Sequence, residues 1–346
     1  MNSPVIGNHI EMYPAGDKMS VFNKSTGKTY VFGAAETKTI VLFDGKRSIE
    51  EISRESEIYS VEDIKRLVEA LSAIGMFKEE KRKQHWFKLK IPVFNPNKLF
   101  KTGGFFTELF FFLIIFGSLA LLFAGVIANA TSFGGLFTKI NSPDQILAEF
   151  LHMGILDWVI ITLCSLVCLV LHELGHTIAA RHYNVNVPEI GFMLYFLVPC
   201  AYTNISGINL LENKRKRIVV LLAGTFVNLG LIGIFYLFLG YVDTHTAAIL
   251  LALIVANAVT IFTNGMVFIK HDGYYIAEVL FDEPMLKENA MNHLKQYVQN
   301  HKNKAVSKEG NIPSLTHIMY MMYSIVSLLY TPILIVGTLI SAFMPV

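Results

Sequence analysis

Five long apolar runs constrain the fold of this chain more than any other feature of its sequence. They cover residues 109–128, 158–180, 218–242, 247–269 and 319–344. Each is close to the ~20 residues that an α-helix needs to cross the hydrocarbon core of a bilayer. Hydrophobic residues make up 53% of the chain and charged residues only 16%, a balance unlike that of soluble domains. The sequence therefore predicts a polytopic α-helical membrane protein with about five spans.

The distribution of lysine and arginine predicts how these spans are oriented. Basic residues concentrate at 81–101, 214–217 and 270–308, whereas the loops at 130–157 and 241–246 contain one lysine and no arginine. Because cytosolic loops carry the excess of basic residues, we expect the N-terminal region in the cytosol and the C-terminus outside the cell membrane. The N-terminal region lacks the apolar core of a cleavable signal peptide, so the first span is expected to direct insertion.

A shorter apolar stretch, 190–198, follows the second predicted span and ends at Pro199. It has about half the length that a spanning helix needs. Backbone that is not helical is tolerated at membrane depth only where protein or water covers it. We therefore expect a re-entrant or interfacial loop here.

The second predicted span contains the sequence HELGH, residues 172–176. His172 and His176 are four residues apart, so both imidazoles can reach one tetrahedral zinc ion from the same side of a helix. Glu173 can act as the general base that takes a proton from a water activated by the metal. A charged group near the bilayer centre costs roughly 2.5–3.5 kcal/mol even on the most lenient scale, which favours a working site. The alternative is a pair of packed histidines that bind no metal.

Zinc needs a third protein ligand, and the candidates are His182, Cys168 and Asp272. His182 has the metzincin spacing, but Ala179 stands where that motif has glycine. Without the glycine the helix should continue and turn His182 about 240° away from the second zinc-binding histidine. Cys168 lies on the same helix as the histidines, where a third ligand would strain the tetrahedron. Asp272 closes the fourth apolar run and could approach from another helix.

Three spaced motifs resemble those of the site-2 intramembrane metalloproteases over about residues 150–280. After HELGH come "GTFVN" at 224–228 and "NGMVFIKHDG" at 264–273. The family has G-P-x-x-N and N-x-x-P-x-P-x-L-D-G at these places. The chain departs from those patterns at four positions: Thr225, Val267 and Ile269 replace prolines, and His271 replaces leucine.

The resemblance implies a zinc endopeptidase with Glu173 as its base. The zinc ligands that it implies are His172, His176 and Asp272. It also implies that Asn228 and Asn264 position substrate, although asparagines in membrane helices often only bond neighbouring helices. Residues 199–217 resemble the loop of bacterial peptide-processing members, in which a re-entrant strand offers its edge to substrate. Tyr202 and Asn204 in that loop are therefore further candidates for substrate positioning.

Residues 1–85 are predicted to form a small α+β domain, joined by a basic linker at 86–104 to a membrane-embedded metalloprotease domain at 105–346 with its core at about 150–280. Two β-rich runs surround a turn that contains Gly27. Three helices follow, over about 35–43, from Ser48 with Glu51 as a capping box, and from Ser60 to near Gly75. The apolar face expected on the third helix comprises Ile64, Leu67, Ala70, Leu71 and Ile74.

Over about residues 15–80 this pattern resembles the PqqD-like winged-helix domain that recognises the leader peptides of ribosomally made, modified peptides. The alternative is a generic winged-helix module with a regulatory role. We do not expect nucleic acid as a partner, because phosphate would be repelled by the acidic residues of the middle helix, which are Glu50, Glu51, Glu55 and Glu57.

The sequence as a whole predicts an intramembrane zinc metalloendopeptidase that cleaves a peptide or membrane-bound precursor near the cytosolic leaflet. With the N-terminal resemblance, we expect it to mature a ribosomally made modified peptide. Its expected partners are the lipid bilayer, the precursor, a peptide-modifying enzyme and an ABC exporter. The alternative is a non-catalytic peptide-binding, immunity or export component on the same fold, against which the complete set of ligands and base argues.

Overall fold

The structure is a computed structural model that describes residues 3–15, 18–26, 28–78, 88–130, 143–195, 198–302 and 318–330. They belong to two compact units, Met1–Ala258 and Val259–Val346. The turn expected at Gly27 lies outside the described residues.

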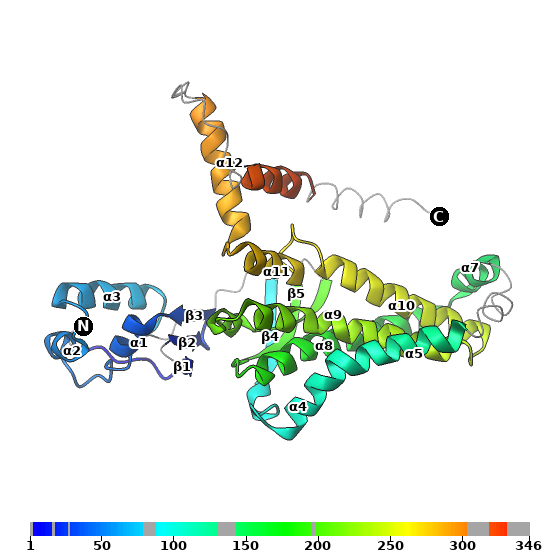
Figure 1. Cartoon of the computed structure of the whole chain (residues 1–346), viewed down its shortest axis with the longest axis horizontal. Helices are drawn as coiled ribbons and strands as arrows, with labels where there is room; N and C mark the ends of the chain where they lie inside the picture. The colour runs from blue at the N-terminus through cyan, green and yellow to red at the C-terminus, as the bar shows by residue number, and fades with distance from the viewer. Residues whose placement is uncertain are drawn as a thin grey trace. The chain divides into compact units, whose positions relative to one another are not determined.

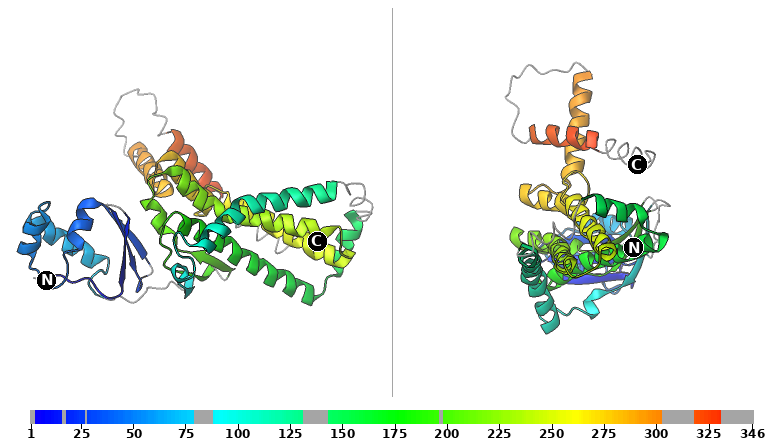
Figure 2. Two further views of the ribbon diagram at one scale, coloured as in Figure 1. Left: turned by 60° about the horizontal axis from the view of Figure 1, so that its bottom comes forward. Right: turned by 90° about the vertical axis from the view of Figure 1, so that its right-hand side faces the viewer.

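Four helical segments of the described chain are long and apolar enough to cross a membrane, which confirms the first four predicted spans. They are α4 (Phe105–Phe112) continued through the π-helical turn η2 (Leu113–Gly117) into α5 (Ser118–Ala130), then α8 (Ile155–His182), α9 (Lys214–Leu239) and α10 (Thr244–Asn264). A short helix, α7 (Pro143–His152), precedes α8. Helix α9 packs against both α5 and α8 (Figures 1 and 2).

The fourth predicted span ends earlier than expected, and the fifth is described only in part. The fourth was expected to continue to residue 269, but α10 ends at Asn264 and turns follow. Gly265 comes next, and glycine disfavours a helix interior by about 1 kcal/mol. Of the fifth predicted span, 319–344, the structure describes only the part within the apolar helix Ile318–Tyr330.

The segment that was expected to be re-entrant or interfacial forms a β-hairpin. It consists of β5 (Ile190–Tyr195) and β6 (Val198–Thr203). A third strand, β4 (Lys88–Phe94), comes from the region before the first span and pairs with β5, giving an antiparallel sheet of order β4-β5-β6. β6 is therefore an edge strand, and it packs against α8. The short helix η3 (Ser206–Leu210) leads from β6 towards α9.

The N-terminal region forms an antiparallel sheet with three helices. Its elements are β1 (Ile10–Ala15), β2 (Lys18–Asn23), β3 (Lys28–Phe32), α1 (Ala34–Ile40), α2 (Ile49–Ser56) and α3 (Val61–Ala73). Both expected strands are present, and β1 adds one that the sequence did not indicate. Ser48 and Glu51 form the expected capping box on α2, and Ser60 forms another with Asp63 on α3.

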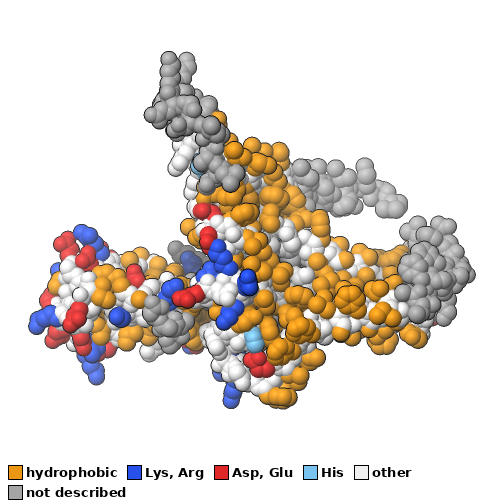
Figure 3. All heavy atoms as spheres, viewed as in Figure 1, with side chains coloured by type: hydrophobic (Ala, Val, Ile, Leu, Met, Phe, Trp, Pro, Cys, Tyr) orange, Lys and Arg blue, Asp and Glu red, His pale blue; other side chains and the backbone are white. Residues whose placement is uncertain are grey.

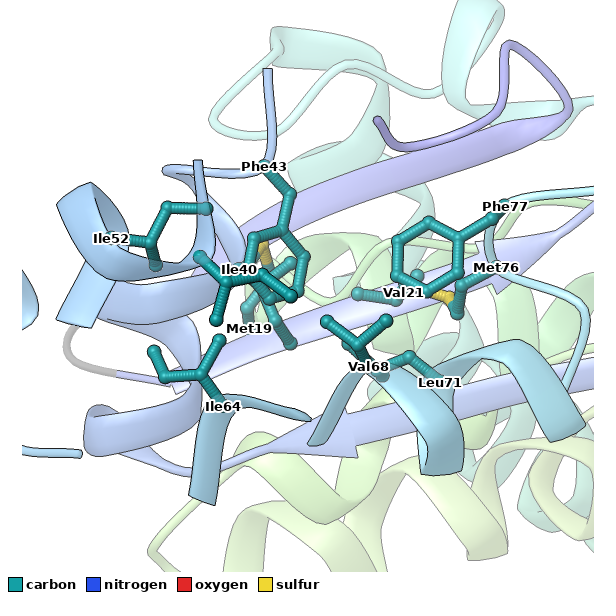
Figure 4. Close-up of a cluster of buried hydrophobic side chains, with 11 residues drawn as sticks. Met19, Val21, Ile40, Phe43, Ile52, Ile64, Val68, Leu71, Met76 and Phe77 are labelled. Atoms are coloured by element: carbon teal, nitrogen blue, oxygen red, sulfur yellow. The ribbon is translucent and has the colours of Figure 1, made fainter. Parts of the chain in front are cut away.

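One hydrophobic core joins the helices α1 to α3 to one face of the N-terminal sheet (Figure 4). Helix α3 contributes Ile64, Val68 and Leu71, all buried. Ala70, expected in this face, is exposed. Val68 takes its place because the 64, 68, 71 spacing follows the helical period more closely.

The second face of the N-terminal sheet is also covered. Val21 points into the core, yet its neighbours Ser20 and Phe22 are only 3% and 4% exposed. Successive side chains of a strand point to opposite faces, so β2 is buried on both sides. On the second side, β2 and β3 contact η3, and the Thr29 hydroxyl donates to Asn204 Oδ1 at 3.4 Å. The sheet therefore packs on the segment that follows β6.

Charged and hydrophobic side chains occupy different parts of the surface, as they do along the sequence. Charged side chains of both signs gather over α2 and α3, whereas hydrophobic side chains cover α5 and α10 (Figure 3). Long apolar helices with outward-facing apolar side chains need lipid around them.

The second unit contains α11 (Asp272–Phe281), α12 (Leu286–Lys302) and the helix Ile318–Tyr330. Tyr274, Leu286 and Tyr323 are buried together in its core. The Tyr323 hydroxyl also donates to the Val267 carbonyl at 2.8 Å, which fixes the turns between α10 and α11 to the last described helix.

Candidate metal centre

Helix α8 brings the two histidines of HELGH together in its buried C-terminal half. His172 and His176 are each 2% exposed. Their Nε2 atoms lie 3.1 Å apart, and the ring planes are nearly perpendicular at 79°. Two imidazole nitrogens thus face the same point from one helix.

A backbone carbonyl sets the tautomer of His176. Its Nδ1 lies 2.8 Å from the carbonyl oxygen of Val220 on α9. A carbonyl can only accept, so Nδ1 carries the proton and Nε2 presents its lone pair. Such a second hydrogen bond is what orients metal-binding histidines in general.

Two glycines allow α9 to lie close to α8 at this point. A Cβ on Gly175 of α8 would come within 3.0 Å of the Ala223 carbonyl oxygen on α9. A Cβ on Gly224 of α9 would come within 2.5 Å of the Nε2 atoms of both His172 and His176. The missing side chain of Gly224 therefore leaves open the space that the two imidazole nitrogens face.

These residues fit a zinc ion. In a tetrahedron with zinc–nitrogen bonds of about 2.0–2.1 Å, two ligand nitrogens are about 3.3 Å apart. The observed separation of 3.1 Å is close to that value. The two imidazoles and the space beside Gly224 thus provide two ligand positions and room for a metal.

Glu173 follows His172 in the sequence, and it is half-buried. Its main-chain carbonyl accepts hydrogen bonds from two hydroxyls, Thr177 at 3.0 Å and Thr203 at 3.1 Å. Its carboxylate is close enough to the Cys200 thiol of strand β6 for the two groups to interact electrostatically. The carboxylate therefore lies on the side of α8 that β6 covers.

Asn228 lies one turn after Gly224 on α9 and is 1% exposed. Its side-chain Nδ2 is buried and has no hydrogen-bond partner among the residues that the structure describes. A buried donor without a partner costs about 1–3 kcal/mol, which makes this amide a candidate for a bond to substrate or water.

Tyr202 and Asn204 both take part in internal contacts. The Tyr202 hydroxyl donates to Glu189 at 3.2 Å, and the Lys90 ammonium lies 4.5 Å from the centre of its ring. Asn204 Oδ1 accepts from Thr29 and from the Ser206 hydroxyl. These contacts support the β4-β5-β6 sheet and its junction with the N-terminal region.

Asp272 and Asn264 belong to the motif that spans the turn between α10 and α11. Asp272 is the half-buried first residue of α11, and Asn264 is the last residue of α10. A Cβ on Gly273 would come within 2.4 Å of the Gly265 carbonyl oxygen. The start of α11 therefore lies against the end of α10. The chain between Asn264 and Asp272, which are eight residues apart, folds back on itself.

His182 is held by the first span. Its Nδ1 lies 2.8 Å from a Glu108 carboxylate oxygen, and its ring stacks on Phe111 with centroids 3.8 Å apart. Cys168 is buried and hydrogen-bonds with Asn257 on α10. Sequence patterns did not indicate the Val220 carbonyl or Thr203, because a main-chain acceptor has no residue signature and Thr203 is distant in the chain.

Comparison with known proteins shows the family of the chain. The model of peptidase family M50 matches residues 159–342, more than half of the chain. A Bacillus subtilis (strain 168) protein described as "Putative peptide zinc metalloprotease protein YydH" is 30% identical over 120 residues. The matched segment covers 34% of this chain and 46% of that protein, so less than half of the relative is spanned. No solved structure matches the chain.

The Gly224 space yields a direct prediction. Gly224→Ala should weaken zinc affinity by about 10–100-fold, because the new methyl group would occupy the space that both Nε2 atoms face. Gly117→Ala is the matched control, since its Cβ would meet only ordinary contacts at 3.5 Å or more. Chelator competition on the purified proteins measures both. Wild-type zinc affinity in Gly224→Ala would show that the metal does not bind beside this residue.

Proposed function

Since the chain belongs to peptidase family M50, whose members are site-2 membrane zinc metalloproteases, we propose that it hydrolyses a peptide bond with Glu173 as general base. The observation that carries the proposal is the pair of Nε2 atoms of His172 and His176, 3.1 Å apart beside a glycine. The zinc ligands in this proposal are His172, His176 and Asp272.

Asp272 is proposed as the third ligand for chemical reasons. Two ligands come from α8, and a catalytic zinc takes three protein ligands with one position left for water or substrate. His182 is bonded to Glu108, and Cys168 to Asn257. The motif around Asp272 resembles the one that supplies the carboxylate ligand in site-2 proteases.

In this proposal Glu173 transfers the proton and Asn228 stabilises the developing charge. Zinc, when bound, supplies a Lewis acid that activates water and polarises the scissile carbonyl. The Glu173 carboxylate takes the proton as the water oxygen bonds to the carbonyl carbon. It returns that proton to the amine as the carbon–nitrogen bond breaks. The Asn228 amide, which has no partner among the described residues, donates to the carbonyl oxygen, where negative charge develops.

Strand β6 is proposed to present the substrate. It is the edge of its sheet, and it packs on the helix that carries Glu173. A peptide unwound within a membrane loses the hydrogen bonds of its helix, and pairing with an edge strand replaces them. The β4 strand covers the opposite edge of β5, so the hairpin offers only one side for such pairing.

The N-terminal sheet is proposed to bind the leader segment of a precursor in the cytosol. Strand β3 is an edge strand, and its Val31 side chain is 42% exposed. An extended peptide can pair there through main-chain hydrogen bonds. Tethering a substrate in this way raises its local concentration towards the millimolar range. A ribosomally made modified peptide, with its modifying enzyme and an ABC exporter, is the class of system proposed.

The base is tested by Glu173→Gln. The variant should retain zinc at the wild-type stoichiometry and lose cleavage by at least about 10²-fold, because the amide cannot take the proton. Elemental analysis and a cleavage assay on the same preparation measure both. Cleavage at the wild-type rate would show that Glu173 does not activate the water.

The third ligand is tested by a pair of variants. Asp272→Asn should lose activity and bind zinc about 10–100-fold more weakly, because a neutral amide is a poor zinc ligand. His182→Ala should keep wild-type zinc affinity, since His182 is bonded to Glu108. An inactive His182→Ala beside an active Asp272→Asn would reverse the assignment.

Leader binding is tested within the full-length chain. Val31→Asp should raise the KM for a precursor about tenfold by placing a charge on the β3 binding edge, and should have no effect on the same precursor without its leader. Val41→Asp is the matched control, because Val41 is 61% exposed but lies beyond α1, outside the sheet. Equal KM values for both variants and both substrates would refute leader binding on β3.

A further inference from the structure

The main-chain carbonyl of Glu173 receives two threonine hydroxyls of different origin. Thr177 donates from the next turn of α8, at 3.0 Å, a common bond within a helix. Thr203 donates from the end of strand β6, at 3.1 Å and thirty residues away in the chain. Only the second bond connects the edge strand to the helix that carries the proposed base.

The residue after Thr203 is fixed as well. The backbone N–H of Asn204 donates to the main-chain carbonyl of Glu189 at 3.0 Å, and the Asn204 side chain accepts from Thr29 of the N-terminal sheet. The C-terminal end of β6 is therefore fixed by its own sheet and by β3. Thr203 adds a bond to α8 at the level of Glu173.

We propose that Thr203 is a positioning residue for peptide hydrolysis. Its hydroxyl sets the height of β6 along α8, so that a peptide paired with this strand places its scissile bond opposite the Glu173 carboxylate. The inference rests on the function proposed above, and Thr203 itself does not touch the reacting atoms. It acts through the strand that binds the substrate.

The expected effect follows from geometry. Without the hydroxyl, β6 keeps its pairing with β5 and its packing on α8, so a peptide still binds its edge. A misplacement of about 1 Å between reacting groups can cost about 10²-fold in rate. Loss of the bond should therefore lower kcat by about 10–100-fold and leave KM within about twofold of wild type.

The test compares Thr203→Val, Thr203→Ser and Thr177→Val. The substrate is a membrane-inserted fluorogenic peptide that the wild type cleaves and Glu173→Gln does not. Thr203→Val should show the loss in kcat, and Thr203→Ser should restore most of it because the hydroxyl returns. Thr177→Val removes a bond to the same carbonyl without freeing the strand, so it should remain near wild type. Zinc content should be equal in all three.

A second readout needs no catalysis. Cys200 lies on β6 three residues before Thr203 and is half-buried. In a chain whose other two cysteines, Cys164 and Cys168, are replaced by alanine, maleimide labelling reports only on this strand. Thr203→Val should label severalfold faster than Thr203→Ser or Thr177→Val, because β6 without this bond can shift along α8 and expose the Cys200 thiol more often while it stays paired with β5.

The two proposals fail in different ways. If Thr203→Val and Thr177→Val have the same kcat, or label at the same rate, Thr203 does not position the strand, whereas the hydrolytic function still stands. If Glu173→Gln cleaves every peptide that the wild type cleaves, the function itself is wrong, and the labelling difference alone would then describe a structural bond.

Discussion

The close approach of α8 and α9 is the constraint on which the rest of this structure depends. Gly175 and Gly224 remove two side chains at the point of contact, and the Val220 carbonyl then reaches His176. The same approach aims two imidazole nitrogens at the space beside Gly224. Because polar groups in an apolar bundle need partners, a change that moves the two helices apart would also disturb the candidate metal centre.

Polar contacts at the C-terminal end of α8 hold this helix in place on several sides. Arg181 is buried and donates to the carbonyls of Phe100 and Val185. His182 pairs with Glu108 of the first span, and Thr203 connects β6 to the main chain of Glu173. The elements before and after α8 in the chain are thus bonded to the turns that carry the site. A catalytic group gains most when its supports are fixed before substrate arrives.

The features that the sequence predicted are local. The first four spans follow from apolar length, and the capped helices from Ser48 and Ser60 with their acidic partners three residues later. The sequence predicts a basic linker where β4 lies, because the segment contains Pro92, which is unusual within a sheet. It becomes a strand by pairing with β5, about 100 residues later. Strand β1 includes Pro14 and likewise needs its partner β2.

In the candidate site, too, the local motifs are predictable from the sequence and the long-range contacts are not. HELGH and "GTFVN" could be recognised from spacing, and the structure places His172 and His176 beside Gly224. The Thr203 bond and the Val220 carbonyl could not, since both depend on contacts between segments far apart in sequence. Asp272 rests on its motif and on the chemistry of zinc.

The most direct test of the zinc centre is X-ray absorption at the zinc edge of the purified wild-type protein. The account predicts one zinc per chain with only nitrogen and oxygen neighbours at about 2.0–2.2 Å and the outer-shell scattering of two imidazoles. Sulfur at about 2.3 Å, which would place a cysteine among the ligands, or a protein that takes up no zinc, would contradict it.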